Sequence, residues 1–291
     1  MKRYKLKKPW KLVTVLFVLF LFALSFCIYK SMNRATVNSS KTNSEEVTNP
    51  QNLGNQVINP EKNYENKPLI NNDKSVPVLM YHSIGFEKGN ELRVPVERFT
   101  EQMKFLKDNG YTTLSLDELY DFFNNNKPIP SKSVVITFDD GYADNYTNAY
   151  PVLKELGLKA TMFVITSTID KNSGYLNSSQ LKEMQNNKIS IESHTVNHVE
   201  LDKIPYAKQL DTLKKSKDMI ENILDNKVYY ICYPVGKWNN DTLKAAKQAG
   251  YKMGFTTKNS LSNKANGLYT LNRVRINASY GITTFKKVIG N

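Results

Sequence analysis

Residues 134–141 read Val-Val-Ile-Thr-Phe-Asp-Asp-Gly, a short apolar run that ends in two adjacent carboxylates and a glycine. A run of this length, rich in β-branched residues, predicts a buried strand. Asp139 and Asp140 then lie at the carboxyl end of that strand, where parallel α/β folds collect functional side chains. Two neighbouring carboxylates repel each other, so the pair predicts a metal ion bound by one of them. A pair of turn residues that caps a helix is the alternative.

Short apolar runs alternate with amphipathic segments on both sides of this strand. The predicted strands are 76–81, 134–138, 160–165, 189–192, 228–233, 253–256 and 271–276, and the predicted helices are 97–108, 116–124, 143–156, 179–185, 206–224 and 241–249. This alternation predicts an α/β fold with a parallel sheet covered by helices. The length of the domain favours a closed or nearly closed barrel, with an open doubly wound sheet as the alternative.

The chain has only three histidines, and all of them can be placed near the carboxylate pair. His82 and His194 each follow a predicted strand, and His198 comes four residues after His194. That spacing puts two imidazoles on one face of a helical turn, where they commonly share a divalent ion. Two histidines and one carboxylate leave positions open for water and a substrate carbonyl, so the set predicts metal-assisted hydrolysis. The segment lacks the glutamate of His-Glu-x-x-His zinc proteases.

The segments Thr137-Phe-Asp-Asp-Gly141 and His194-Thr-Val-Asn-His198 together resemble the polysaccharide deacetylases of carbohydrate esterase family four, the NodB-homology domains. The resemblance covers residues 75–291 and implies a distorted, incomplete (β/α) barrel. Members of this family remove N-acetyl or O-acetyl groups from sugar polymers. Position by position, the resemblance implies that Asp139 is the general base. It also implies a Zn site, with Co, Ni or Mn as alternatives, whose ligands are Asp140, His194 and His198.

The third motif of the family is usually Arg-x-Pro-Tyr-Gly, and here it reads Cys232-Tyr-Pro-Val-Gly236. The arginine that normally orients the base is therefore replaced. Val235 keeps a backbone N–H, which can still donate to an oxyanion. Arg273 and Arg275 alternate along a predicted strand and face the same side. We expect one of them to contact Asp139, and a pair of surface arginines on an edge strand is the alternative.

The late histidine that serves as general acid in most of the family is missing, because no histidine follows His198. A histidine in an early Met-Tyr-His-Ser context resembles the branch that deacetylates the poly-N-acetylglucosamine of biofilms. That resemblance implies His82 as the acid, and its unperturbed pKa near neutrality suits the role. The alternative is a packed core histidine. Tyr142 and Trp238 are candidates for contact with sugar rings, or else pack against the rim of the site.

The N-terminal part predicts a membrane anchor. Residues 1–11 carry six basic and no acidic residues, and residues 12–29 are almost entirely apolar. Eighteen residues at about 1.5 Å each approach the thickness of a bilayer core, and the basic flank should stay in the cytoplasm. A cleaved signal peptide, which would give a secreted protein, is the alternative. Residues 30–74 are polar and predict a disordered linker, so the catalytic domain is expected over 75–291.

The net charge is +13, and subtracting the six charges of the basic flank leaves 13 − 6 = +7. The remaining lysines form no concentrated basic run, so we expect no nucleic-acid partner. They are solvated surface residues, or a mildly basic surface that favours an anionic wall or membrane. Cys27 lies in the apolar segment and should not pair with Cys232, which we expect to be a buried residue and not a nucleophile.

These features together predict a monomeric, membrane-anchored enzyme at the cell surface. We expect metal-dependent hydrolysis of N-acetyl groups from a polymer of N-acetylglucosamine, with release of acetate. The sequence leaves open whether the polymer is poly-β-1,6-linked N-acetylglucosamine, peptidoglycan or a chitin-like chain. Two other functions stay open. One is an O-acetyl esterase acting on xylan or acetylated wall sugars, and the other is a catalytically inactive module that binds the wall.

Overall fold

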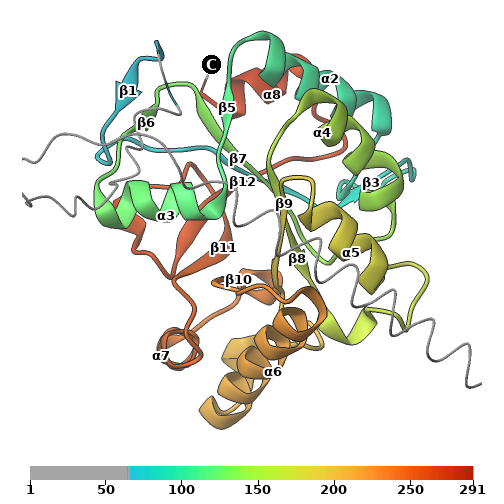
Figure 1. Ribbon diagram of the computed structural model, residues 1–291, viewed down its shortest axis with the longest axis vertical. Helices are drawn as coiled ribbons and strands as arrows, with labels where there is room; N and C mark the ends of the chain where they lie inside the picture. The colour runs from blue at the N-terminus through green and yellow to red at the C-terminus, as the bar shows by residue number, and fades with distance from the viewer. Residues whose placement is uncertain (1–63, 65, 291) are drawn as a thin grey trace, which may run out of the picture. The chain divides into compact units, whose positions relative to one another are not determined.

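The computed structural model describes residues 64 and 66–290, and seven of its parallel strands close into a ring (Figure 1). Around the ring the order is β2-β12-β11-β10-β9-β8-β7, and β7 pairs again with β2. The strands are β2 (Val78–Tyr81), β7 (Ser133–Phe138), β8 (Ala160–Val164), β9 (Ile189–Ser193), β10 (Tyr230–Cys232), β11 (Met253–Asn259) and β12 (Leu271–Arg275). The predicted barrel is confirmed, and the open doubly wound sheet is wrong.

The ring is thinnest between β9 and β10, which pair at a single position, Ser193 with Ile231. Neighbouring pairs are longer, and β8 pairs with β9 over five positions. The barrel is therefore distorted at the seam beside the segment that follows β9. That segment carries two of the three histidines.

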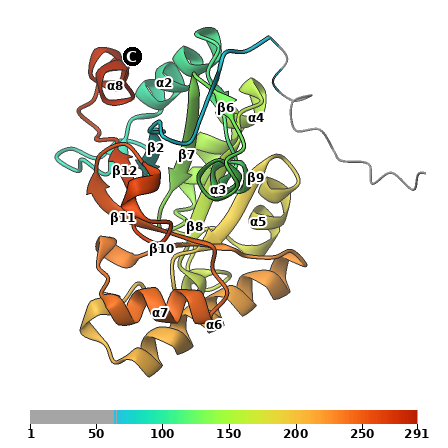
Figure 2. The same ribbon diagram turned by 90° about the vertical axis from the view of Figure 1, so that its left-hand side faces the viewer.

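Helices pack against the sides and the amino end of the barrel (Figures 1 and 2). They are α2 (Val96–Asp108), α3 (Leu116–Asn125), α4 (Tyr150–Leu156), α5 (Ser178–Gln185), α6 (Tyr206–Leu224), α7 (Asn240–Gln248) and α8 (Ile282–Val288). Short turns of 3-10 helix are η3 (Thr166–Thr168), η4 (Leu201–Lys203), η5 (Pro234–Gly236) and η6 (Lys264–Asn266). A single helix was predicted over 143–156, but a π-helix, η2 (Asn145–Ala149), precedes α4. Periodicity alone could not reveal this inserted turn.

Capping side chains explain where several helices begin. Ser115 accepts a hydrogen bond from the Glu118 N–H, and the Glu118 side chain accepts one from the Ser115 N–H. Asn177 and Asn239 form similar reciprocal caps at α5 and α7. Each cap satisfies backbone donors that the first helical turn cannot pair, so local sequence fixes these boundaries.

Alternating strand residues divide the core into two clusters. Those that face outward, among them Leu79, Ile136 and Met162, pack against the helices. Those that face inward, among them Val135 and Phe255, fill the barrel together with side chains from α3. The inward cluster contains the first residues of β2, β10, β11 and β12, and Tyr230, which begins β10, donates its hydroxyl to Asp117 of α3. α3 therefore lies at the amino end of the barrel. The carboxyl ends of the strands stay accessible for chemistry.

Several short elements were not predicted. β1 (Leu69–Ile70) pairs with β6 (Ile129–Pro130), so the folded chain begins before Ser75 and includes part of the segment assigned to the linker. The others are β3 (Ser83–Ile84), β4 (Arg93–Val94), β5 (Thr112–Thr113) and α8. Strands of two residues are too short to show a periodic pattern, because long-range pairing alone defines them.

Within residues 64 and 66–290, no helix is long and apolar enough to cross a membrane. The predicted basic flank (1–11), the predicted anchor (12–29) and most of the predicted linker lie outside the described residues.

Gly254 in β11 gives rise to a prediction about stability. A Cβ at this position would overlap the Tyr233 hydroxyl and lie 2.9 Å from the Tyr269 carbonyl oxygen. Because overpacking forces neighbouring atoms to shift, we expect Gly254→Ala to lower the free energy of unfolding by about 1–3 kcal/mol in urea titrations.

The matched test removes the obstructing hydroxyl. Tyr233→Phe should restore part of the loss in the double variant, since that hydroxyl is buried and has no hydrogen-bond partner in the described chain. If the two substitutions instead acted independently, the predicted clash would be wrong.

Candidate active site

The two aspartates that follow β7 point to different partners because the backbone turns sharply between them. Asp140 has φ 70° and Gly141 has φ 77°, both in the left-handed region. The Gly141 N–H donates to the Asp139 carbonyl oxygen at 2.9 Å. A Cβ on Gly141 would lie 2.9 Å from Val164 Cγ1, so only glycine fits this turn. As a result, one carboxylate reaches β12 and the other reaches the loop after β9.

Asp139 is buried against an arginine that is also fully buried. Arg273 donates from Nη1 to Oδ1 at 2.7 Å and from Nη2 to Oδ2 at 2.6 Å. Its other donors reach the Thr137 hydroxyl, the Thr256 carbonyl oxygen and the Cys232 sulfur. Burial alone would raise the pKa of Asp139, but the charge and hydrogen bonds of Arg273 hold that pKa well below its usual range. Asp139 is therefore ionised at neutral pH.

Only one of the two candidate arginines contacts this carboxylate. Arg275 is the last residue of β12 and is partly exposed, and its backbone N–H binds Asn259 Oδ1. No salt bridge in the described part of the chain involves its side chain. The pairing of β11 with β12 also shifts register between Phe255 and Asn259. Strand alternation put both arginines on one side, but Arg273 is fully buried whereas Arg275, at the end of β12, is partly exposed.

Asp140 faces two imidazoles. Its Oδ1 lies 3.4 Å from His194 Nε2 and 3.5 Å from His198 Nε2, and one ligand atom from each residue lies within 4.8 Å of the others. Asp140 Oδ1 is buried and has no hydrogen-bond partner in the described chain. A tetrahedral ion with ligands at about 2.1 Å separates them by about 3.4 Å. The unpaired oxygen and the donor set therefore fit a divalent metal ion.

The backbone fixes the orientation of His194. Its N–H donates to the Val164 carbonyl oxygen at 2.9 Å, and its Nδ1–H donates to the Cys232 carbonyl oxygen at 2.8 Å. Nε2 is thereby directed at Asp140, as in metal sites where a second contact sets the tautomer. Burial lowers the pKa of His198, which favours the neutral, metal-binding form of that ring.

The prediction that His194 and His198 meet on a helical turn is wrong. Residues 194–198 form no helix, because Thr195 has φ 68° and His198 has φ 57°. The Thr195 hydroxyl accepts a hydrogen bond from the His198 N–H at 3.2 Å. The two rings still meet, with centroids 4.8 Å apart, but a tight loop brings them together.

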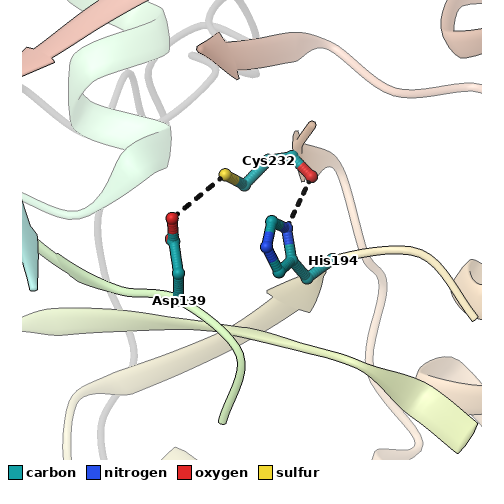
Figure 3. A group of neighbouring side chains, drawn as sticks. All are labelled: Asp139, His194 and Cys232. Carbon is teal, nitrogen blue, oxygen red and sulfur yellow. Dashed lines mark hydrogen bonds between the residues drawn. The ribbon is translucent and has the colours of Figure 1, made fainter. Parts of the chain in front are cut away.

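Asp139, His194 and Cys232 form a second group of ligand types beside the first (Figure 3). Arg273 lies within 3 Å of both Asp139 and Cys232, so its charge opposes a cation at this position. Burial raises the pKa of the Cys232 thiol and keeps it neutral. Cys232 is thus buried, as expected, and this group is not a metal site.

His82 follows β2 and lies at the same end of the barrel. Its Nε2 is 3.9 Å from Asp139 Oδ2, and its side chain is 12 % exposed. Asn145, the first residue of the π-helix, donates from Nδ2 to the His82 carbonyl oxygen at 2.9 Å. Burial lowers the pKa of His82, while the charge of Asp139 opposes this shift. The structure therefore brings all three histidines and both aspartates into one site.

Val235 lies on the rim of the site in a strained conformation. Its φ of 56° is rare for a β-branched residue, and such strain gathers at functional sites. Its carbonyl oxygen accepts from the Thr257 hydroxyl at 3.2 Å, whereas no hydrogen bond in the described chain uses its N–H. Two further candidates are Trp238, three residues after Val235, and Tyr142, two residues after Asp140.

Trp238 is 39 % exposed, as a residue that contacts a ligand must be. Tyr142 is half-buried and stacks on Tyr175 with ring centroids 5.2 Å apart. Burial and the charge of Asp140 raise the pKa of Tyr142, so its phenol stays protonated. Sequence reasoning missed Tyr175 and Asn145, because neither belongs to a recognisable motif.

Comparisons with known proteins identify the family. Residues 126–254 match the profile of the family described as Polysaccharide deacetylase. The Putative polysaccharide deacetylase YxkH of Bacillus subtilis is 44% identical over 210 residues, which cover 72% of this chain and 74% of that protein. The Poly-beta-1,6-N-acetyl-D-glucosamine N-deacetylase of Staphylococcus epidermidis is 31% identical and covers 68% of this chain and 78% of its own length.

Solved structures agree with these relatives. The Streptococcus pyogenes deacetylase PplD, in complex with acetate, superposes with a TM-score of 0.72 at 35% identity, over 75% of this chain and 100% of that one. A polysaccharide deacetylase from Bacillus cereus, BC0361, gives 0.67 at 35% identity, over 74% and 69%. The chain belongs to the polysaccharide deacetylase family.

The geometry around Asp140 predicts the outcome of a metal-binding experiment. We expect Asp140→Asn and His198→Gln each to weaken Zn binding at least about tenfold, because a neutral amide oxygen is a poorer zinc ligand than a carboxylate or an imidazole. Metal content after dialysis against graded free Zn would measure the loss.

The control is His82→Gln, which changes a histidine of the same site outside the ligand set. It should bind Zn as the unchanged protein does. Loss of metal from this variant, or full retention by His198→Gln, would show that the ligands are assigned wrongly.

Proposed function

We propose that the protein hydrolyses N-acetyl groups of an N-acetylglucosamine polymer at the cell surface, in a metal-dependent reaction that releases acetate. One observation supports this most strongly. An ionised, buried carboxylate lies beside a second carboxylate whose free oxygen faces two imidazoles. A base and a metal site therefore lie side by side, an arrangement that suits hydrolysis of an unactivated amide.

Asp140, His194 and His198 would hold the ion. Two imidazoles and a carboxylate suit Zn best, and Co, Ni or Mn are alternatives. When bound, such an ion polarises a carbonyl group and lowers the pKa of water.

Asp139 is the proposed general base. It is ionised, so it can accept a proton from the attacking water. Arg273 serves as a positioning residue: its two hydrogen bonds fix the plane of the carboxylate, and its charge prevents protonation. Arg273 thus orients the base in this chain, a role that the arginine of the third motif, replaced here by Cys232, normally has.

His82 is the proposed general acid. An amide nitrogen leaves readily only when it is protonated. His82 can supply this proton, because its Nε2 lies 3.9 Å from Asp139 Oδ2 in the same site. The free N–H of Val235 would donate to the oxyanion. Tyr142 and Trp238 would contact sugar rings, since aromatic faces and phenol hydroxyls are suited to both stacking and hydrogen bonding.

The poly-β-1,6-linked polymer named for the staphylococcal relatives supports an N-acetylglucosamine substrate here. We place the catalytic domain outside the cell on a single anchor at residues 12–29, supported by the basic flank and the apolar run. The protein is proposed to act as a monomer. Protease treatment of intact cells would remove the domain if this placement is right.

His82 separates amide from ester hydrolysis. We expect His82→Gln to lower kcat on an N-acetylglucosamine oligomer by about 100- to 10,000-fold, because the amine then leaves without a proton. Hydrolysis of an aryl acetate should fall far less, since its phenolate is a weak base and leaves without a proton. Acetate release measured on both substrates tests this.

Equal losses on the two substrates would contradict the assignment of His82 as the acid. Turnover of acetylated xylan, with none of the N-acetylglucosamine oligomer, would favour the esterase. Metal binding without acetate from any substrate would favour a wall-binding module.

Arg273 is expected to control the pH dependence of kcat/KM, because it sets the pKa of Asp139. In Arg273→Met the burial of Asp139 is no longer opposed, so the pKa of Asp139 rises and the acidic limb of the kcat/KM profile should move to higher pH. Arg275→Met is the matched control and should leave the profile in place.

The pair of Arg273 and Asp139 also makes the free energy of unfolding depend on pH, and the depressed pKa of Asp139 gives the direction. Because the pKa of Asp139 is depressed in the folded state, its contribution is present above the unfolded value of about 3.9 and is lost as pH falls through the folded value. At pH 7 we expect Arg273→Met to destabilise the protein by about 3–5 kcal/mol, since it leaves an uncompensated buried charge. A stability change equal to that of Arg275→Met would contradict this.

A further inference from the structure

A cavity of about 560 Å³ opens beside the active site. It lies between η5, the second half of β11 and the first residues of β12, and its volume is typical of a small-ligand site. Two contacts connect it to the catalytic residues. Val235 forms part of its wall, and Thr256, another wall residue, accepts a hydrogen bond from Arg273 Nε at 3.0 Å.

The cavity carries positive charge without a counter-charge. Lys237 and Lys258 line it and are exposed, and no acidic residue is part of its lining. In the described part of the chain, neither lysine takes part in a salt bridge, whereas Lys244 on the next helix pairs with Asp241 at 3.3 Å. Two unpaired ammonium groups at one cavity attract an anion and repel a cation.

A buried amide adds a directional contact. Asn272 is 6% exposed and lines the cavity, yet its side chain has no hydrogen-bond partner in the described residues. The hydroxyls of the neighbouring wall residues are already bonded, for example Thr256 to the Leu271 carbonyl oxygen and Thr257 to that of Val235. This amide carries both a donor and an acceptor that no described residue uses, so it can bind a polar group of a ligand in the cavity.

We propose that this cavity is a subsite for an acidic sugar, a unit of the same glycan strand that carries a carboxylate. The inference rests on the proposed deacetylase function and deepens it by naming the class of strand. Trp238 offers a face to the sugar ring, Asn272 binds a polar substituent, and Lys237 and Lys258 bind the carboxylate.

The charges of Lys237 and Lys258 also disfavour binding of a deacetylated strand. Deacetylation turns a neutral acetamide into an amine that is protonated at neutral pH. A strand whose unit in the subsite has lost its acetyl group and carries no carboxylate is then repelled by Lys237 and Lys258. The subsite therefore selects strands in which acetylated glucosamine alternates with acidic units over neutral homopolymers.

Two tetrasaccharides of equal length test this. One is a homopolymer of N-acetylglucosamine, and the other alternates N-acetylglucosamine with N-acetylmuramic acid, which carries a carboxylate. Acetate release by the full-length protein should give a KM for the acidic oligomer roughly fivefold below that for the neutral one, as expected for exposed charge pairs. Raising the salt to 0.5 M should remove this preference.

The variant Lys237→Gln/Lys258→Gln should bring the ratio of the two KM values close to one. Both lysines are exposed, so the substitutions should not disturb folding. The matched control is Lys104→Gln/Lys107→Gln, which removes two exposed lysines of α2, away from the cavity, and should leave the ratio as it is. Because both double variants lower the net charge by two, this control separates the effect of charge at the cavity from the effect of the net charge of the protein.

Equal KM values in the unchanged protein, or a preference that survives in Lys237→Gln/Lys258→Gln, would overturn the subsite while leaving the deacetylase function in place. Acetate from neither oligomer would instead reject the proposed function. Calorimetric titration with the acidic oligomer still decides the subsite in that case. Binding that weakens roughly fivefold in the lysine variant and not in the control supports it, and unchanged binding rejects it.

Discussion

The buried pair of Arg273 and Asp139 is the interaction on which the active site depends. Two charges without contact to water are stable only when every donor and acceptor is satisfied, and here five donor contacts of the guanidinium find acceptors. Those acceptors come from β7, the segment after it, β10 and β11, while the arginine comes from β12. They can meet only if the strands close into a ring, because β2 joins β12 to β7. The ionised state of Asp139 therefore depends on closure of the barrel, because closure brings Arg273 to it.

A sharp turn lets two adjacent aspartates stay ionised. Asp140 and Gly141 both have positive φ, which directs one carboxylate to a guanidinium and the other to two imidazoles. Each negative charge then has its own positive partner or ligand set, so their mutual repulsion is offset twice. The positive φ of Val235 is a second strained backbone conformation in the site, and its N–H is the proposed oxyanion donor. Asp139 and Asp140 can thus have different roles although they are neighbours in sequence.

The structure explains why this chain can have Cys232 where the third motif of the family usually has an arginine. Cys232 is small, and its sulfur lies 2.9 Å from Arg273 Nη2. A guanidinium from β12 therefore fills the space that a larger side chain at position 232 would need. The charge beside the base is kept, but a different strand supplies it. Thr256 and Asn272, neighbours of this arginine, line the cavity that carries Lys237 and Lys258.

The sequence by itself determined the seven barrel strands, the six helices α2 to α7, the residues at the strand ends, and the set of aspartates and histidines. Hydrophobic periodicity and capping residues are local, and they are legible without a structure. Tertiary structure alone decided that the ring closes, that Arg273 and not Arg275 meets Asp139, and that a left-handed loop brings His194 to His198. It also decided that β1 pairs with β6, and that two lysines and an unused amide share a cavity. These depend on contacts between residues far apart in the chain, or on positive φ angles, and neither leaves a periodic trace in the sequence.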